Sequence, residues 1–140
     1  MCRWNAWYGQ PLAIGAVERA VGFIEATAQA RGIEHAVQMT LGFSDGERLW
    51  AVRYSTERRS RTLYISADRD TVQALHPDDP RFARLTDEDR IIVSEPLSDL
   101  PGVWVAVPEA TALVVQPGAD ERLDFRPRAP APETLMVGSP

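Results

Sequence analysis

The chain has 140 residues, with fifteen arginines, no lysine and twenty acidic residues, and its net charge at pH 7 is −5. This length fits a single domain, and no apolar run approaches the roughly 20 residues of a membrane-spanning helix. The acidic balance and the lack of a large basic cluster argue against nucleic-acid binding. The N-terminus also lacks the apolar stretch of a signal peptide. We therefore expect a soluble, cytoplasmic domain that binds neither nucleic acid nor membrane.

The content of cysteine and histidine limits the chemistry that is available. A single cysteine excludes an intramolecular disulfide and is typical of a reducing compartment. Cys2, His35 and His76 do not have the spacing of metal ligands. We therefore expect no bound metal and no cofactor.

The N-terminal third predicts a strand followed by a long helix. Residues 1–11 are rich in aromatic side chains, and we expect a short strand that ends at Gly9 and Pro11. From Ile14 onward apolar residues recur at helical spacing, and Gly32 follows as a candidate C-cap. The pattern therefore predicts a helix over residues 14–31 that covers one face of a sheet.

Residues 37–54 predict a β-hairpin. Apolar side chains alternate with small or polar ones along both strands, which is typical of strands with one buried face. These apolar positions are Val37, Met39, Leu41 and Phe43 on the first strand and Trp50, Val52 and Tyr54 on the second. The link between the strands contains Asp45-Gly46, and this pair favours a tight turn in which both residues have positive φ.

The remaining sequence alternates short apolar runs with proline-containing turns. We expect a solvated arginine-rich link at residues 58–61, a short helix over residues 70–75, and strands over residues 62–66, 90–94, 103–107, 112–116 and 123–125. The Pro- and Ala-rich residues 128–140 predict a flexible tail. The predicted fold class is therefore α+β, with antiparallel sheets and one long covering helix in a single domain over residues 1–127.

Cys2 is the candidate catalytic residue. Removal of Met1, which a small second residue favours, would leave a thiol and a free α-amine on the same residue. The α-amine titrates at about 7.7–8.0, so it could accept the proton of the thiol, as in N-terminal threonine enzymes. The alternative is a buried, inert cysteine. We interpret His35 and His76 as loop residues, and Trp50 and Tyr54 as core residues.

Several segments of the chain resemble class II glutamine amidotransferases, in the stand-alone branch that includes the ergothioneine-pathway amidohydrolases. The matching segments, in order, are Met1-Cys2-Arg3-Trp4, Tyr8-Gly9 and Pro11, then Gln38-Met39-Thr40, Ser44 to Ala51, Arg53-Tyr54-Ser55, Ser94 to Leu97 and Trp104 to Pro108. The resemblance implies an N-terminal-nucleophile hydrolase fold, an αββα sandwich of four layers. It also implies Cys2 as the nucleophile and glutamine or a γ-glutamyl compound as the substrate.

The resemblance has a gap in the middle of the domain. The family continues through an Asn-Gly-Asp-Gly-Phe-Gly stretch, a substrate-binding His-x-Arg strand and a His-Asn-Gly segment, and none of them occurs here. Asn5 is the only asparagine. The chain therefore resembles the two ends of the domain, joined between Gln10 and Ile14. The oxyanion donors and the carboxylate-binding arginine that the family uses would be absent, so we expect the isolated chain to be inactive.

Three interpretations stay open at this point. The chain could be an amidotransferase or γ-glutamyl amidohydrolase completed by another polypeptide, a non-catalytic binding or dimerisation module, or a truncated gene product. In each case a missing layer would expose apolar surface, and we expect self-association or a complementary protein subunit. The positions expected to be uncovered are Val37, Met39, Leu41, Trp50 and Val52.

Overall fold

The computed structural model describes residues 10–131, with an α+β fold and antiparallel strands. The two helices are α1 (Gln10–Gln29) and α2 (Arg69–Leu75). The strands are β1 (Gln38–Ser44), β2 (Leu49–Ser55), β3 (Tyr64–Ser66), β4 (Ile92–Val93), β5 (Trp104–Ala106), β6 (Thr111–Val115) and β7 (Glu121–Asp124). Every strand expected from the sequence between residues 37 and 125 is present, within a few residues of its expected bounds.

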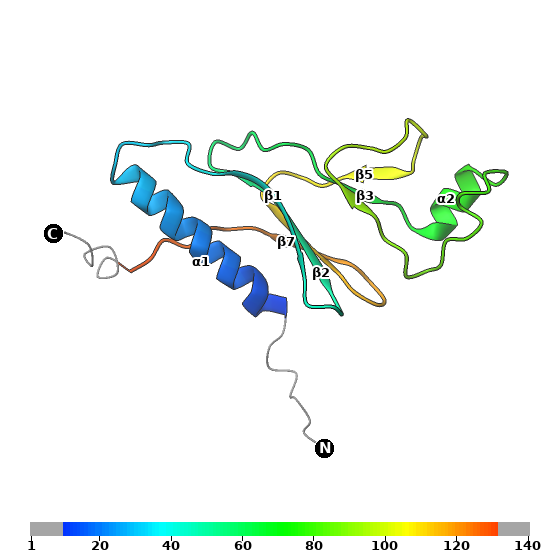
Figure 1. Cartoon of the computed structure of the whole chain (residues 1–140), viewed down its shortest axis with the longest axis horizontal. Coiled ribbons are helices and arrows are strands. Elements are labelled where there is room, and N and C mark those ends of the chain that lie inside the picture. Colours follow the sequence, from blue (N-terminus) through cyan, green and yellow to red (C-terminus); the bar gives the residue numbers. More distant parts are fainter. Residues whose placement is uncertain (1–9, 132–140) are drawn as a thin grey trace, which may run out of the picture.

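The strands form two sheets, and α1 covers one face of the larger one. The four-stranded sheet has the order β1-β2-β6-β7, and the three-stranded sheet has the order β4-β3-β5. Figure 1 shows α1 running along the larger sheet. The core between helix and sheet contains Ile14 and Val21 from α1 and Trp50, Val52, Ala112, Val114 and Phe125 from the sheet side. The apolar side chains that recur at helical spacing on α1 thus pack against the apolar side chains that alternate along the strands.

A second core lies between the two sheets. The face of the four-stranded sheet that is turned away from α1 contributes Ala51 and Leu113, and Leu63, Ile65 and Val107 complete the cluster. The helix α2 lies beyond the three-stranded sheet, at the opposite end of the molecule from α1 (Figure 1). The order through the main body is therefore helix, sheet, sheet. None of the helices within residues 10–131 is both long and apolar enough to span a bilayer.

The start of α1 corrects one expectation from the sequence. The strand predicted for residues 1–11 falls largely outside the described residues, but Gln10 and Pro11 belong to the first turn of α1. Proline is tolerated there because the first N–H groups of a helix have no partner within the helix. At the other end Gly32 has a φ of 74°, and Ile33 N–H donates to the carbonyl of Ala28 at 2.9 Å. The expected glycine cap is confirmed.

The hairpin is confirmed, but its turn differs from the expected one. β1 and β2 pair in continuous register from Gln38 opposite Ser55 to Ser44 opposite Leu49. Gly46 has a φ of 94°, whereas Asp45 does not have a positive φ. The Oδ1 atom of Asp45 instead accepts N–H groups from Glu47 at 2.9 Å and Arg48 at 2.8 Å. The N–H of Arg48, and then that of Glu47, holds the pKa of Asp45 below its usual value.

The expectation of uncovered apolar residues holds for only one of the five named positions. Trp50 and Val52 are 4% and 0% exposed because α1 covers them, and Val37 and Met39 are half-buried against the same core. Leu41 on β1 is 36% exposed. The helix therefore closes most of the surface that was expected to be open, and what stays accessible lies at the edge strand.

Candidate functional site

The candidate nucleophile Cys2 lies outside the residues that the structure describes. Its position, its protonation and its surroundings therefore stay predictions. The described chain begins at Gln10, where α1 starts, and residues 10–131 contain two polar clusters and an apolar cavity.

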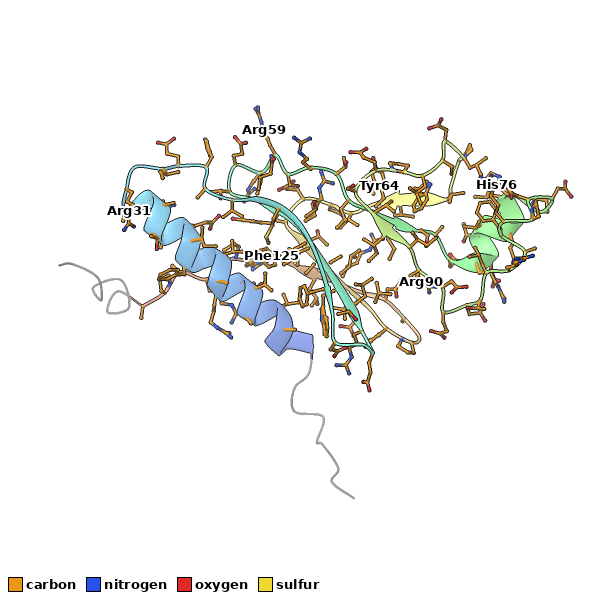
Figure 2. All side chains as sticks on the ribbon, in the orientation of Figure 1. Arg31, Arg59, Tyr64, His76, Arg90 and Phe125 are labelled. Carbon is orange, nitrogen blue, oxygen red and sulfur yellow. The ribbon has the colours of Figure 1, made fainter. Side chains whose placement is uncertain are left out.

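The two histidines occupy the peripheral positions expected from the sequence. His35 lies in the link between α1 and β1, with a side chain that is 60% exposed and an Nε2 atom 4.0 Å from Glu57 Oε2. His76 follows the last residue of α2, at the far end of the molecule in Figure 2, and its Nε2 atom is 2.9 Å from the carbonyl oxygen of Pro101. Among the described residues, no three Asp, Glu, His or Cys side chains gather as metal ligands would.

The most elaborate polar cluster surrounds Glu109, between β5 and β6. Its Oε1 atom accepts the N–H of Ser55 at 3.0 Å, and its Oε2 atom accepts the N–H of Ser60 at 3.1 Å and a short hydrogen bond from the Ser60 hydroxyl. The Nε atom of Arg53 lies 3.8 Å from Oε2. Arg53 also donates through Nη1 to the carbonyl of Val107. No sequence motif marks this cluster, because Glu109 lies about fifty residues after its partners Ser55 and Ser60.

The Glu109 cluster has the features of a structural clamp. Both carboxylate oxygens already accept protein donors, which leaves little capacity to take a proton from a substrate. Its partners lie at the end of β2 and in the link that follows, where Arg59 N–H also donates to Ser55 Oγ at 2.7 Å. We therefore infer that Glu109 holds the link after β2 against the start of β6.

A second, partly buried network joins α1 to the hairpin. The hydroxyls of Tyr54 and Thr56 both donate to Oε1 of Glu25, at 2.6 and 2.7 Å, and Thr56 Oγ1 accepts the N–H of Val37 at 3.2 Å. Burial, followed by the hydrogen bond to Glu25 and the charge on that carboxylate, raises the pKa of Tyr54 above its usual value. Tyr54 therefore stays protonated near neutral pH. It was expected in the core, and it is partly buried and packs against the core between α1 and the sheet.

An apolar cavity lies between α2 and the three-stranded sheet, with a volume of about 290 Å³. Its walls include Val72, Phe82, Leu85, Ile91, Val103 and Trp104. The polar atoms near it have protein partners: Trp104 Nε1 donates to Ser98 Oγ at 3.3 Å, and Ser66 Oγ accepts the N–H of Ile91 at 3.0 Å. Arg81 and Asp89 also line the cavity. Arg81 is paired with Asp79, and Asp89 Oδ2 accepts the N–H of Thr86, so the cavity offers mainly apolar contact.

Comparison with known proteins links this fold to a solved structure. No family model matches the chain, and no curated protein is significantly similar to it. A glutamine aminotransferase class-II domain protein from Silicibacter pomeroyi is similar, with 25% sequence identity and a TM-score of 0.64. The match covers 83% of this chain and 45% of that one, so this chain spans less than half the length of the solved structure. The chain therefore has a class II glutamine amidotransferase-like fold, as the sequence motifs implied.

Proposed function

We propose that this chain is a class II glutamine amidotransferase-like domain in which Cys2 is the N-terminal nucleophile, and that the isolated chain does not hydrolyse glutamine. The observation that carries the proposal is the structural match to a class II domain protein over 83% of this chain but only 45% of the other. The Met1-Cys2-Arg3-Trp4 motif supports Cys2 as the nucleophile. A match to less than half of the larger structure is compatible with the absence of the family's central segments from this sequence.

The chemistry requires more than a thiol. An N-terminal cysteine can attack a γ-amide carbonyl after its own α-amine accepts the thiol proton. The tetrahedral oxyanion that forms then needs hydrogen-bond donors, and loss of a single donor lowers turnover by about 10²–10³. The chain has no Asn-Gly element to supply them, since Asn5 is its only asparagine.

Binding of a glutamine α-carboxylate requires an arginine that is free to form a bidentate pair. Among the arginines that form ion pairs, Arg53 and Arg90 have the least exposed side chains, at 17% and 15%. Arg53 is held by Glu109, and Arg90 Nε lies 2.9 Å from Asp120 Oδ2. Neither of these two is available as a carboxylate clamp. Because the His-x-Arg strand that carries this arginine in the family does not occur in the sequence, we expect the clamp to come from a complementary polypeptide.

The test is the release of glutamate from glutamine by the purified chain and by its Cys2→Ala variant. We expect no measurable difference between the two, because the thiol lacks oxyanion donors and a substrate clamp. Turnover near the value for an ordinary enzyme, about 10 s⁻¹, that Cys2→Ala abolishes would contradict the proposed inactivity. Genomic DNA read across the codons for Gln10 to Ile14 is a second test, since intervening codons there would restore a complete domain.

A second candidate function is a non-catalytic module that assembles with another protein chain. The observation that favours it is β1, a seven-residue edge strand whose residues are mostly exposed. In this case Cys2 would have no catalytic role, and Cys2→Ala would leave assembly unchanged.

A further inference from the structure

The strand β1 forms an unusually open edge of the four-stranded sheet. It stands at one end of the order β1-β2-β6-β7, and its seven residues pair with β2 without a bulge. Its sequence, QMTLGFS, contains no charged residue and no proline. Natural edge strands are normally short, bulged or charged, because an open edge can pair with another strand. β1 has none of these protections.

The backbone groups that face outward from β1 can be identified from the pairing. Thr56 N–H donates to the carbonyl of Val37, and Asp45 N–H donates to the carbonyl of Arg48. Backbone N–H and C=O groups alternate in direction along an antiparallel strand. The backbone groups of the odd-numbered residues of β1 therefore point toward β2. The outward groups belong to Gln38, Thr40, Gly42 and Ser44. Within residues 10–131 no strand pairs with them.

The geometry points to a second copy of this chain as the occupant of the β1 edge, and we propose that two copies pair antiparallel about a two-fold axis at Leu41. An antiparallel arrangement is the one that a two-fold axis produces when a strand pairs with itself. Leu41 then lies opposite its own copy, Met39 lies opposite Phe43, and Thr40 lies opposite Gly42. The outward groups of the two strands form about eight backbone hydrogen bonds, and the two sheets become one.

Charge favours self-pairing at this edge over the other one. The opposite edge, β7, carries Glu121, Arg122 and Asp124 within four residues. Charged side chains on an edge strand oppose pairing between sheet edges, so β7 has a protection that β1 lacks. Two copies with a net charge of −5 each repel one another, so an uncharged edge is where they can approach most closely.

A hollow beside β1 supports the same arrangement. Its volume is about 390 Å³, and it is bordered by Leu41 and Gly42 from β1, by Leu63, and by Ile92 and Val93 from β4. β4 is also an edge strand, in the three-stranded sheet. The core between the two sheets is therefore open beside the outer edge of β1. Because a two-fold axis that joins two β1 strands runs perpendicular to the sheet, the hollows of the two copies face each other. Each copy then covers the opening of the other.

This inference goes beyond the proposed function, since it requires neither Cys2 nor amide chemistry. The first test is sedimentation of the full chain at micromolar concentration, where we expect a dimer. We expect Leu41→Lys and Leu41→Glu each to raise the apparent dissociation constant by about tenfold or more, because each places like charges opposite one another at the axis. An equimolar mixture of the two variants should recover the dimer. Such recovery also demonstrates that both variants fold.

A backbone test separates edge pairing from other contacts. Thr40→Pro removes an outward N–H from β1 and leaves the inward hydrogen bonds to β2 in place. The matched control is Arg122→Pro, since Phe125 N–H donates to the carbonyl of Ala110 and the N–H of residue 122 therefore faces outward from β7. We expect loss of the dimer with Thr40→Pro alone. The proposal is overturned if the chain is monomeric, if the mixture of Leu41 variants stays monomeric, or if Thr40→Pro and Arg122→Pro behave alike.

Discussion

Gly22 lies so close to the backbone of Arg128 that a Cβ atom on residue 22 would be 2.1 Å from the carbonyl oxygen of Arg128. The segment after β7 crosses α1 at this point. Arg128 N–H donates to the carbonyl of Glu18 at 3.0 Å, and its Nη2 atom lies 2.9 Å from Glu18 Oε2. The N–H of Arg126 donates to Glu18 Oε1 at 2.9 Å. Glu18 is only 5% exposed, so its charge is compensated by the crossing segment.

The crossing predicts an unusual response to a helix-favouring substitution. Alanine normally stabilises a helix interior by about 1 kcal/mol over glycine, but we expect Gly22→Ala to lower the free energy of unfolding by about 1–3 kcal/mol. The methyl group would displace the backbone of Arg128. Urea unfolding measures the change. Gly15→Ala is the control, because its Cβ would meet only Arg19 Nη1 at 3.5 Å, and it should be neutral or stabilising. Equal effects at the two glycines would contradict the close crossing.

The Glu109 clamp predicts a loss of stability when its carboxylate is removed. Glu109→Ala leaves the N–H groups of Ser55 and Ser60 without their acceptor, and we expect the free energy of unfolding to fall by about 1–3 kcal/mol. Glu47→Ala serves as the control, since Glu47 is an exposed residue of the hairpin turn and should change stability by less than about 0.5 kcal/mol. If both variants melt at the wild-type temperature, Glu109 does not hold the link after β2.

The Tyr54–Glu25 hydrogen bond predicts a loss of stability in alkali. The folded-state pKa of Tyr54 is raised above the value of 10.0 for a free tyrosine. The contribution of this phenol is therefore fully present below pH 10 and is lost as the pH rises from there toward the folded-state pKa. We expect Tyr54→Phe to weaken that alkaline loss and to lower stability at neutral pH by about 1–3 kcal/mol. Thermal unfolding between pH 8 and pH 11 measures both effects. Tyr64→Phe is the control and should retain the alkaline loss, while persistence of the full loss in Tyr54→Phe would refute the assignment.

The nucleophile role of Cys2 predicts removal of Met1. With Met1 in place the nitrogen of Cys2 is an amide and cannot act as the base. Intact-mass measurement of the expressed chain should therefore give the mass without the initiator methionine. Retention of Met1 in most molecules would exclude the proposed chemistry, whatever the fold.

The sequence by itself determined the local elements and the family likeness. Strand alternation over residues 37–54 and helical spacing after Ile14 depend on neighbouring residues, and both elements formed as expected. The matching segments alone indicated the class II amidotransferase-like fold, since such motifs are short and local. The start of α1 was misplaced because Pro11 is compatible both with a strand end and with the first turn of a helix.

Only the tertiary structure decided which elements cover one another's apolar side chains. The sequence pattern marked Trp50 and Val52 as apolar but could not show that α1 covers them, because burial depends on residues distant in the chain. The same holds for the Glu109 clamp, whose donors lie about fifty residues earlier, and for the contact of Gly22 with Arg128. These contacts arise from the packing of layers, which fixes distances between segments that no local pattern encodes.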